Sequence, residues 1–150
     1  MSTTIEFYSV TLPGKEIADL SIKSLFDFLG SFPVADFSLH LLLPDDLDML
    51  CQSLHGQNPV ISTAFGDQLV KTLWFDGQSA LLSLISSQFV IALAKMTNIQ
   101  IEQAGIAWAS IFEKSEAVRE APTFRALLRL HEVAKDAVAN NRSLVVWLVY

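Results

Sequence analysis

The chain has 150 residues and a net charge of −6 at neutral pH, with 51% hydrophobic and only 17% charged side chains. This composition excludes a disordered chain. The length is sufficient for one domain with a substantial core. Residues 1–75 carry three lysines against nine carboxylates, whereas residues 76–150 carry seven cations and seven carboxylates. The acidic first half favours basic proteins as partners and disfavours nucleic acid.

The cysteine content and the hydropathy pattern predict a cytoplasmic protein. Cys51 is the only cysteine, so no internal disulfide can form. The first ten residues lack a basic start and an apolar signal core, which argues against a secretory signal. Residues 77–94 are uncharged, but their six serine and glutamine side chains make a membrane span unfavourable. We therefore expect no membrane association.

The first half of the chain predicts a strand and two helices. Alternation predicts the strand at 4–11, and helical spacing of apolar residues predicts a helix at 15–29 that ends at Gly30. Pro44 and the carboxylates behind it are typical of a helix start, so a second helix is expected from 44 to 54, ending at Gly56. The segment 37–43 is compatible with either a strand or the lead-in to that helix.

The second half begins with the strongest hairpin signal. Two apolar runs, 69–75 and 79–85, flank Asp76-Gly77, and a helix capped by Ser86 or Ser87 is expected to follow and run to Met96. A helix at 100–114 contains Gly105, which costs on the order of 1 kcal/mol relative to alanine.

The end of the chain predicts an amphipathic helix and a buried strand. Pro122 opens the helix, Asn140-Asn141 ends it, and its apolar stripe includes His131 and Val138. The continuous apolar run 144–149 is typical of an interior strand. Residues 1–150 are therefore expected to form a single α+β domain. Its small, mostly antiparallel or mixed sheet contains the hairpin 69–85 and the N- and C-terminal strands, and packs against about five helices.

The residues with catalytic potential are better explained as core. Cys51 and His55 share one helix face, but a structural zinc needs about four ligands, and no second cysteine is present. His131-Glu132 lacks the second histidine of a zinc-protease motif, so we expect His131 to be a core histidine bonded to the backbone. Glycine-rich phosphate loops and a nucleophile elbow are absent. No catalytic residue, cofactor or metal is predicted.

The densest acidic cluster is the candidate binding site. It consists of Asp36, Asp45, Asp46 and Asp48. Carboxylates at a helix start also complement the helix dipole, which explains Asp45 and Asp46 without any partner. The spacing does not match a calcium loop. We expect these four side chains to form one exposed patch that binds a basic protein.

The C-terminal residues carry a resemblance to a known family. The run from Phe124 to Ala134, then Ala137-Val138 and Ser143–Leu148, resembles the ending of the YfbM-like bacterial domains of unknown function. Phe7-Tyr8-Ser9 followed by Pro13, and the helix from Gln88 to Ala94, are compatible with it. The resemblance covers roughly a third of the chain and implies a compact α+β bacterial domain. Relatives of this sort often look like immunity proteins, and no functional residue is carried over.

These observations favour a non-catalytic binding protein, most concretely an immunity or antitoxin-like protein that neutralises a basic effector through an acidic surface. One alternative is a structural domain whose excess apolar surface closes a homodimer. A second alternative is a small enzyme or ligand carrier that uses Cys51 and His55.

Overall fold

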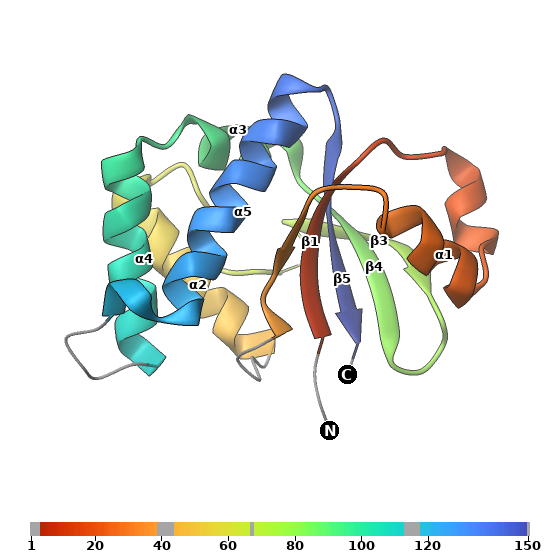
Figure 1. The fold of residues 1–150 in the computed structure, drawn as a ribbon, viewed down its shortest axis with the longest axis horizontal. Coiled ribbons are helices and arrows are strands. Elements are labelled where there is room, and N and C mark those ends of the chain that lie inside the picture. Colours follow the sequence, from red (N-terminus) through yellow and green to blue (C-terminus); the bar gives the residue numbers. More distant parts are fainter. Residues whose placement is uncertain (1–3, 39–43, 67, 113–117, 150) are drawn as a thin grey trace.

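The structure is a computed structural model that describes residues 4–38, 44–66, 68–112 and 118–149. Its centre is a five-stranded sheet in the order β2-β1-β5-β4-β3, in which every neighbouring pair is antiparallel. The strands are β1 (Thr4–Val10), β2 (Val34–Asp36), β3 (Val70–Phe75), β4 (Ala80–Ile85) and β5 (Ser143–Val149). The N- and C-terminal strands therefore pair in the middle of the sheet, as Figure 1 shows.

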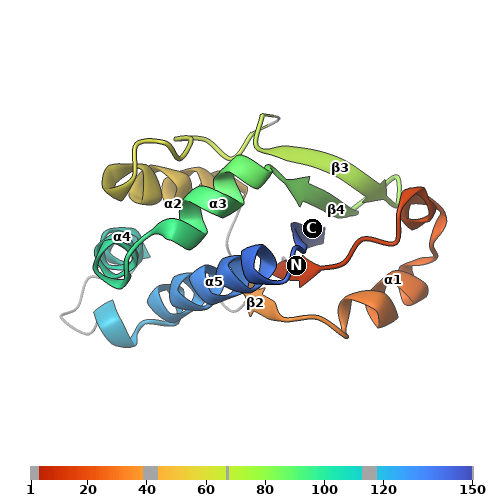
Figure 2. The same cartoon turned by 90° about the horizontal axis from the view of Figure 1, so that it is seen from above.

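The helices form two layers on opposite faces of this sheet. One face carries α2, α3, α4 and α5, and the other carries η1 and α1 (Figures 1 and 2). The helices are η1 (Lys15–Asp19), α1 (Ile22–Leu29), α2 (Pro44–Gln57), α3 (Ser87–Lys95), α4 (Asn98–Phe112), η3 (Val118–Glu120) and α5 (Pro122–Ala139). This arrangement confirms the predicted α+β fold and shows that the sheet is antiparallel.

The central strands are buried on both faces because helices cover both. Alternate residues of β5 enter different cores: Val146 packs under the four-helix layer, whereas Trp147 packs under α1. A strand covered on both sides has no solvated face, so its side chains form a continuous apolar run. The prediction of an interior strand at 144–149 is confirmed.

The predicted hairpin is also confirmed, and Asp76 explains its turn. One carboxylate oxygen of Asp76 accepts hydrogen bonds from the backbone amides of Gln78, Ser79 and Ala80 at 2.8–3.0 Å. These bonds lower the pKa of the Asp76 carboxyl. Gly77 supplies the positive φ of 86° that side-chain-bearing residues rarely adopt.

The single helix predicted at 15–29 is wrong, because the chain breaks at Leu20 and Ser21. Leu20 and Ser21 are extended, and the Ser21 hydroxyl accepts the backbone amide of Ser24, which starts α1 as a new helix. A tertiary contact accompanies the break. The Leu20 carbonyl has no partner within a helix and instead accepts the indole N–H of Trp74 at 2.8 Å.

Two other helix ends differ from the prediction. The helix α2 passes Gly56 to Gln57, because the amide of Asn58 still bonds the carbonyl of Leu54. The helix α4 starts at Asn98, two residues early, because Thr97 and Gln100 form a reciprocal capping box.

The two helices after the hairpin follow the prediction with local exceptions. Ser86 precedes α3 but its hydroxyl makes no capping bond. In α5 the apolar stripe is buried as expected, except that Leu128 is partly buried and Val138 is 48% exposed. Gly105 has a packing role, since a Cβ there would lie 2.8 Å from the ring of Phe124. The glycine allows α4 and α5 to approach.

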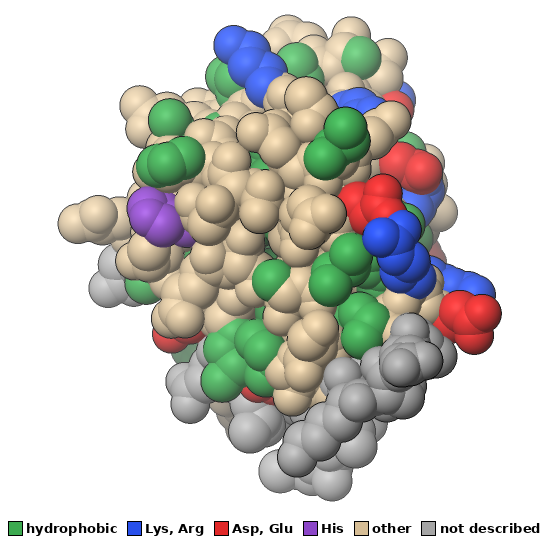
Figure 3. Space-filling model, turned by 90° about the vertical axis from the view of Figure 1, so that its left-hand side faces the viewer, with side chains coloured by type: hydrophobic (Ala, Val, Ile, Leu, Met, Phe, Trp, Pro, Cys, Tyr) green, Lys and Arg blue, Asp and Glu red, His purple; other side chains and the backbone are tan. Residues whose placement is uncertain are grey.

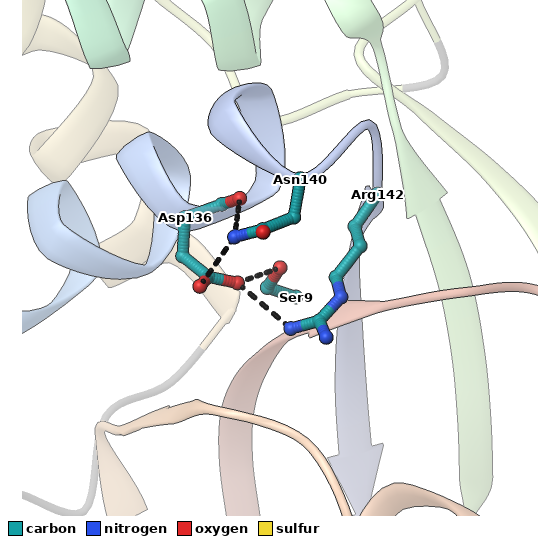
Figure 4. Close-up of polar contacts among 4 residues, drawn as sticks. All are labelled: Ser9, Asp136, Asn140 and Arg142. Atoms are coloured by element: carbon teal, nitrogen blue, oxygen red, sulfur yellow. Dashed lines mark hydrogen bonds and ion pairs between the residues drawn. The ribbon is translucent and has the colours of Figure 1, made fainter.

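The turn from α5 to β5 is held by Asp136, whose contacts appear in Figure 4. One carboxylate oxygen accepts the hydroxyl of Ser9 at 2.7 Å and a guanidinium N–H of Arg142 at 3.1 Å. The other oxygen accepts the side-chain amide of Asn140 at 3.0 Å. Ser9 is fully buried on β1, so this carboxylate joins the last helix to the central strand.

Replacing Asp136 by asparagine should destabilise the protein. The substitution removes the charge and leaves an amide that cannot accept all three donors, so we expect the free energy of unfolding to fall by about 1–3 kcal/mol. Urea denaturation measures this. Asp27→Asn, an exposed position on α1, should change it by less than about 0.5 kcal/mol. Equal effects of the two substitutions would contradict the role of Asp136.

Candidate protein-binding surface

Two carboxylates lie directly opposite each other at one side of the sheet. In the pairing of β1 with β2, Glu6 is the register partner of Asp36. In the pairing of β1 with β5, Glu6 is also the partner of Trp147. Directly opposed residues point to the same face of a sheet. Asp36, Glu6 and Trp147 therefore form a row across three strands, on the face that carries α1.

The hydroxyl of Tyr8 interacts with both carboxylates. It donates a hydrogen bond to a carboxylate oxygen of Glu6. The pKa of Tyr8 lies well above its ordinary value, first because the ring is buried, then because of the hydrogen bond to Glu6 and the negative charges of Glu6 and Asp36. Asp36 is exposed and Glu6 is half-buried, so the negative potential here reaches solvent.

An exposed aromatic ring lies beside the row. Phe26 of α1 packs edge-on against Trp147, with ring centroids 5.4 Å apart and an interplanar angle of 74°. Trp147 is buried beneath it, whereas Phe26 is 49% exposed. We define Glu6, Asp36 and Phe26 as the β1–β2 acidic surface.

The structure separates the four predicted binding residues. Asp36 belongs to the β1–β2 acidic surface, whereas Asp46 and Asp48 lie in the first turns of α2. In Figure 2, β2 lies at one edge of the sheet near α5, while α2 lies on the other side of the helical layer beside α3. Asp45 is the second residue of α2, but its side chain is outside the described residues.

Asp48 has a structural contact that the sequence did not reveal. Its carboxylate accepts the backbone amide of Phe65 at 2.7 Å and so ties the loop after α2 to the helix. Asp46 is half-buried. Asp46 and Asp48 are thus less exposed than Asp36.

Glu6 is the site residue that sequence reasoning missed. Its signal was present, because alternation places Glu6 on the same strand face as Tyr8 and Val10, both of which are buried. A carboxylate on an otherwise apolar strand face calls for a specific explanation. Its neighbour Asp36 is 30 positions away, and only strand pairing brings the two together.

The arginines found in ion pairs bind carboxylates in the second half of the chain. Within the described residues, the ion pairs are Arg119–Glu102, Arg129–Glu132 and Arg142–Asp136. Arg129 reaches β2, but there it donates to the carbonyl of Val34 at 3.0 Å. The arginines of these pairs therefore bond carboxylates of their own half of the chain.

Cys51 and His55 do not form a reactive pair. Cys51 is fully buried, and burial, with a smaller contribution from the charge of Asp48, raises the pKa of its thiol to about 12. His55 Nδ1 lies 2.7 Å from the carbonyl of Ile61, a hydrogen-bond acceptor. The thiol therefore stays protonated at neutral pH. Among the described residues, no group of three or more histidine, cysteine or carboxylate side chains is placed to hold a metal ion.

His131 is a core histidine, as predicted. It is 4% exposed, and its Nε2 lies 3.0 Å from the carbonyl of Met96. It lines a cavity of about 290 Å³ between α4 and α5 that also includes Glu102, Arg119 and Lys135. Burial and the nearby charge of Lys135 lower the pKa of His131.

A larger cavity of about 490 Å³ lies where β3, β4, α3, the end of α5 and the start of β5 meet. Its walls are mainly apolar and include Ile85, Val90 and Leu144. Serine hydroxyls and Lys71 lie around it. No cysteine or histidine lines it.

Comparison with known proteins found no match: no family model, curated protein or solved structure resembles the chain closely enough to assign it. The resemblance to YfbM-like domains stays a prediction. In the part of the chain that the structure describes, no helix has the length and apolar character needed to cross a membrane.

The lowered pKa of His131 predicts a pH-dependent stability. The unfolded chain binds a proton more tightly at this position than the folded protein, so stability is fully present above about pH 6.5 and falls as the pH drops below it. One such proton gives a slope of at most about 1.4 kcal/mol per pH unit. Urea denaturation of the wild type and of His131→Gln between pH 7.5 and 5 measures the difference. Identical slopes for the two proteins would show that His131 does not contribute.

Proposed function

We propose that the chain is a non-catalytic binding protein of the immunity or antitoxin type, which neutralises a basic effector by docking the β1–β2 acidic surface onto it. The observation that carries this proposal is the direct opposition of Glu6 and Asp36 on neighbouring strands. Like charges directly opposite each other destabilise a sheet. A lysine or arginine of a partner placed between them would remove that repulsion.

The surface offers three kinds of contact to an arginine or lysine. Glu6 and Asp36 supply carboxylate oxygens, which bind a guanidinium by charge-assisted hydrogen bonds. The exposed ring of Phe26 lies on the same side of the sheet and offers apolar and cation–π contact. A hydrogen bond to a charged group contributes roughly 1.5–3 kcal/mol. One well-placed cation of the partner would therefore contribute a large share of the binding free energy.

The charge distribution supports the same partner class. The chain carries a net charge of −6, contributed by its first half, and the ion pairs of the described residues lie in its second half. A net negative field accelerates encounter with a basic protein and weakens as salt rises. Asp45 and Asp46 remain in the proposal as a second acidic segment, at the start of α2.

The test compares two double variants with the same change in charge. Glu6→Gln with Asp36→Asn removes the β1–β2 carboxylates, while Glu16→Gln with Asp27→Asn removes two exposed carboxylates from η1 and α1. A short arginine-rich peptide serves as the probe, and NMR titration measures its affinity and the residues it shifts. We expect the first variant to bind about tenfold more weakly, and the amides of β1 and β2 to shift in the wild type.

The control variant separates a site from a general charge effect. It should retain most of the affinity of the wild type, because only the overall field is reduced. An equal loss of peptide affinity in both variants would mean that the peptide is attracted only by the net charge. The β1–β2 acidic surface would then no longer be the proposed site. Shifts centred on α2 would transfer the site to Asp45 and Asp46.

A further inference from the structure

The strands β4 and β5 separate at one end of the sheet. Their last register pair is Leu84 with Val145. Beyond this pair, Ile85 still pairs with β3 and Leu144 still pairs with β1, but the two residues do not pair with each other. Both line the cavity of about 490 Å³, which therefore lies where the sheet opens.

The lining of this cavity is mostly aliphatic. Leu69, Val90 and Leu144 are buried in it, whereas Ile91 and Val138 are 43% and 48% exposed. No aromatic side chain of the described residues lines it. A ligand that covered Ile91 and Val138 would remove aliphatic surface from water, which is favourable. The cavity therefore fits an aliphatic chain, and such a chain would bury the exposed end of the apolar stripe of α5.

Among the described residues that line the cavity, the charged side chains are all cations. They are Lys71 and Arg142, although the chain as a whole has 16 carboxylates and 10 lysine and arginine residues. Arg142 is paired with Asp136. Lys71 is exposed and has no ion pair or hydrogen bond with the described residues. The lining therefore offers one unpaired positive charge, which suits a ligand with one negative charge.

The smaller cavity between α4 and α5 has a different lining. It contains both signs of charge, from Glu102, Glu132, Arg119 and Lys135. Figure 3, which faces the α4 side of the molecule, likewise shows acidic and basic side chains intermingled along one margin. A lining of mixed charge gives no preference for an anion. The preference is thus specific to the cavity between β4 and β5.

We propose that this larger cavity binds an aliphatic monocarboxylate, with its hydrocarbon chain against Ile91 and Val138 and its carboxylate at Lys71. The register places Lys71 opposite Leu84, two residues before Ser86, which also lines the cavity. The hydroxyl of Ser86 makes no capping bond to α3, so it can donate to the same carboxylate. A volume of about 490 Å³ lies within the range of small-molecule sites.

This inference is independent of the proposed function. The cavity lies beside β3 and β4, whereas the β1–β2 acidic surface lies at the opposite edge of the sheet. Neither Glu6 nor Asp36 lines the cavity. Binding of a carboxylate ligand and binding of an arginine-rich peptide can therefore be measured separately.

Three probes with the same octyl chain test the cavity. Octanoate carries a negative charge, octyl alcohol is neutral and octylammonium is positive, and NMR titration measures the affinity of each and the amides that it shifts. We expect octanoate to shift the amides of 68–71, 84–91 and 137–144, and to bind about tenfold more tightly than octyl alcohol. Octylammonium should bind most weakly. Absence of octanoate shifts in these segments, or equal affinity for the three probes, would overturn the inference.

Two pairs of variants at exposed positions assign the two ends of the ligand. Lys71→Gln should weaken octanoate about tenfold and leave octyl alcohol unchanged, whereas Lys23→Gln on α1 makes the same change in charge and should affect neither. Ile91→Ser should weaken both probes about threefold, whereas Ile99→Ser on α4 should weaken neither. Equal loss of octanoate affinity in Lys71→Gln and Lys23→Gln, or no effect of Ile91→Ser, would contradict the proposed placement of the ligand.

Discussion

The antiparallel pairing of β1 with β5 is the constraint on which the rest of the structure depends. It runs from Thr4 opposite Val149 to Val10 opposite Ser143, and both helical layers pack against it. The two strands come from opposite ends of the chain, so the centre of the sheet requires contacts of the longest sequence separation. Asp136 reinforces this pairing by bonding Ser9 of β1 and Arg142 just before β5.

The register of β1 with both of its neighbours determines where the acidic surface lies. Strand register places Glu6 between Asp36 and the buried Trp147, on a face that is otherwise apolar. A carboxylate pair of this kind lowers the stability of the folded chain, and binding sites often keep such destabilising residues because function requires them.

Most of the fold was predictable because its signals are local. The hairpin around Asp76-Gly77, the last helix and the apolar run of β5 follow from turn chemistry and periodicity. The break at Leu20 combines a local signal, the Ser21 cap of α1, with a hydrogen bond from Trp74 that no local pattern reveals. The same limit applies to the site: Asp36 stood out in an acidic cluster, whereas Glu6 becomes its neighbour only through strand register.

A double-mutant cycle between Glu6 and Asp36 tests most directly whether the two carboxylates form a repulsive pair. Glutamine and asparagine retain acceptors for Tyr8 and for the amide of Ser38, so the substitutions change mainly the charge. We expect Glu6→Gln and Asp36→Asn each to raise the free energy of unfolding by about 0.2–1 kcal/mol, and the double variant to gain less than the sum. Loss of stability in both single variants, with strictly additive effects, would contradict the opposed pair.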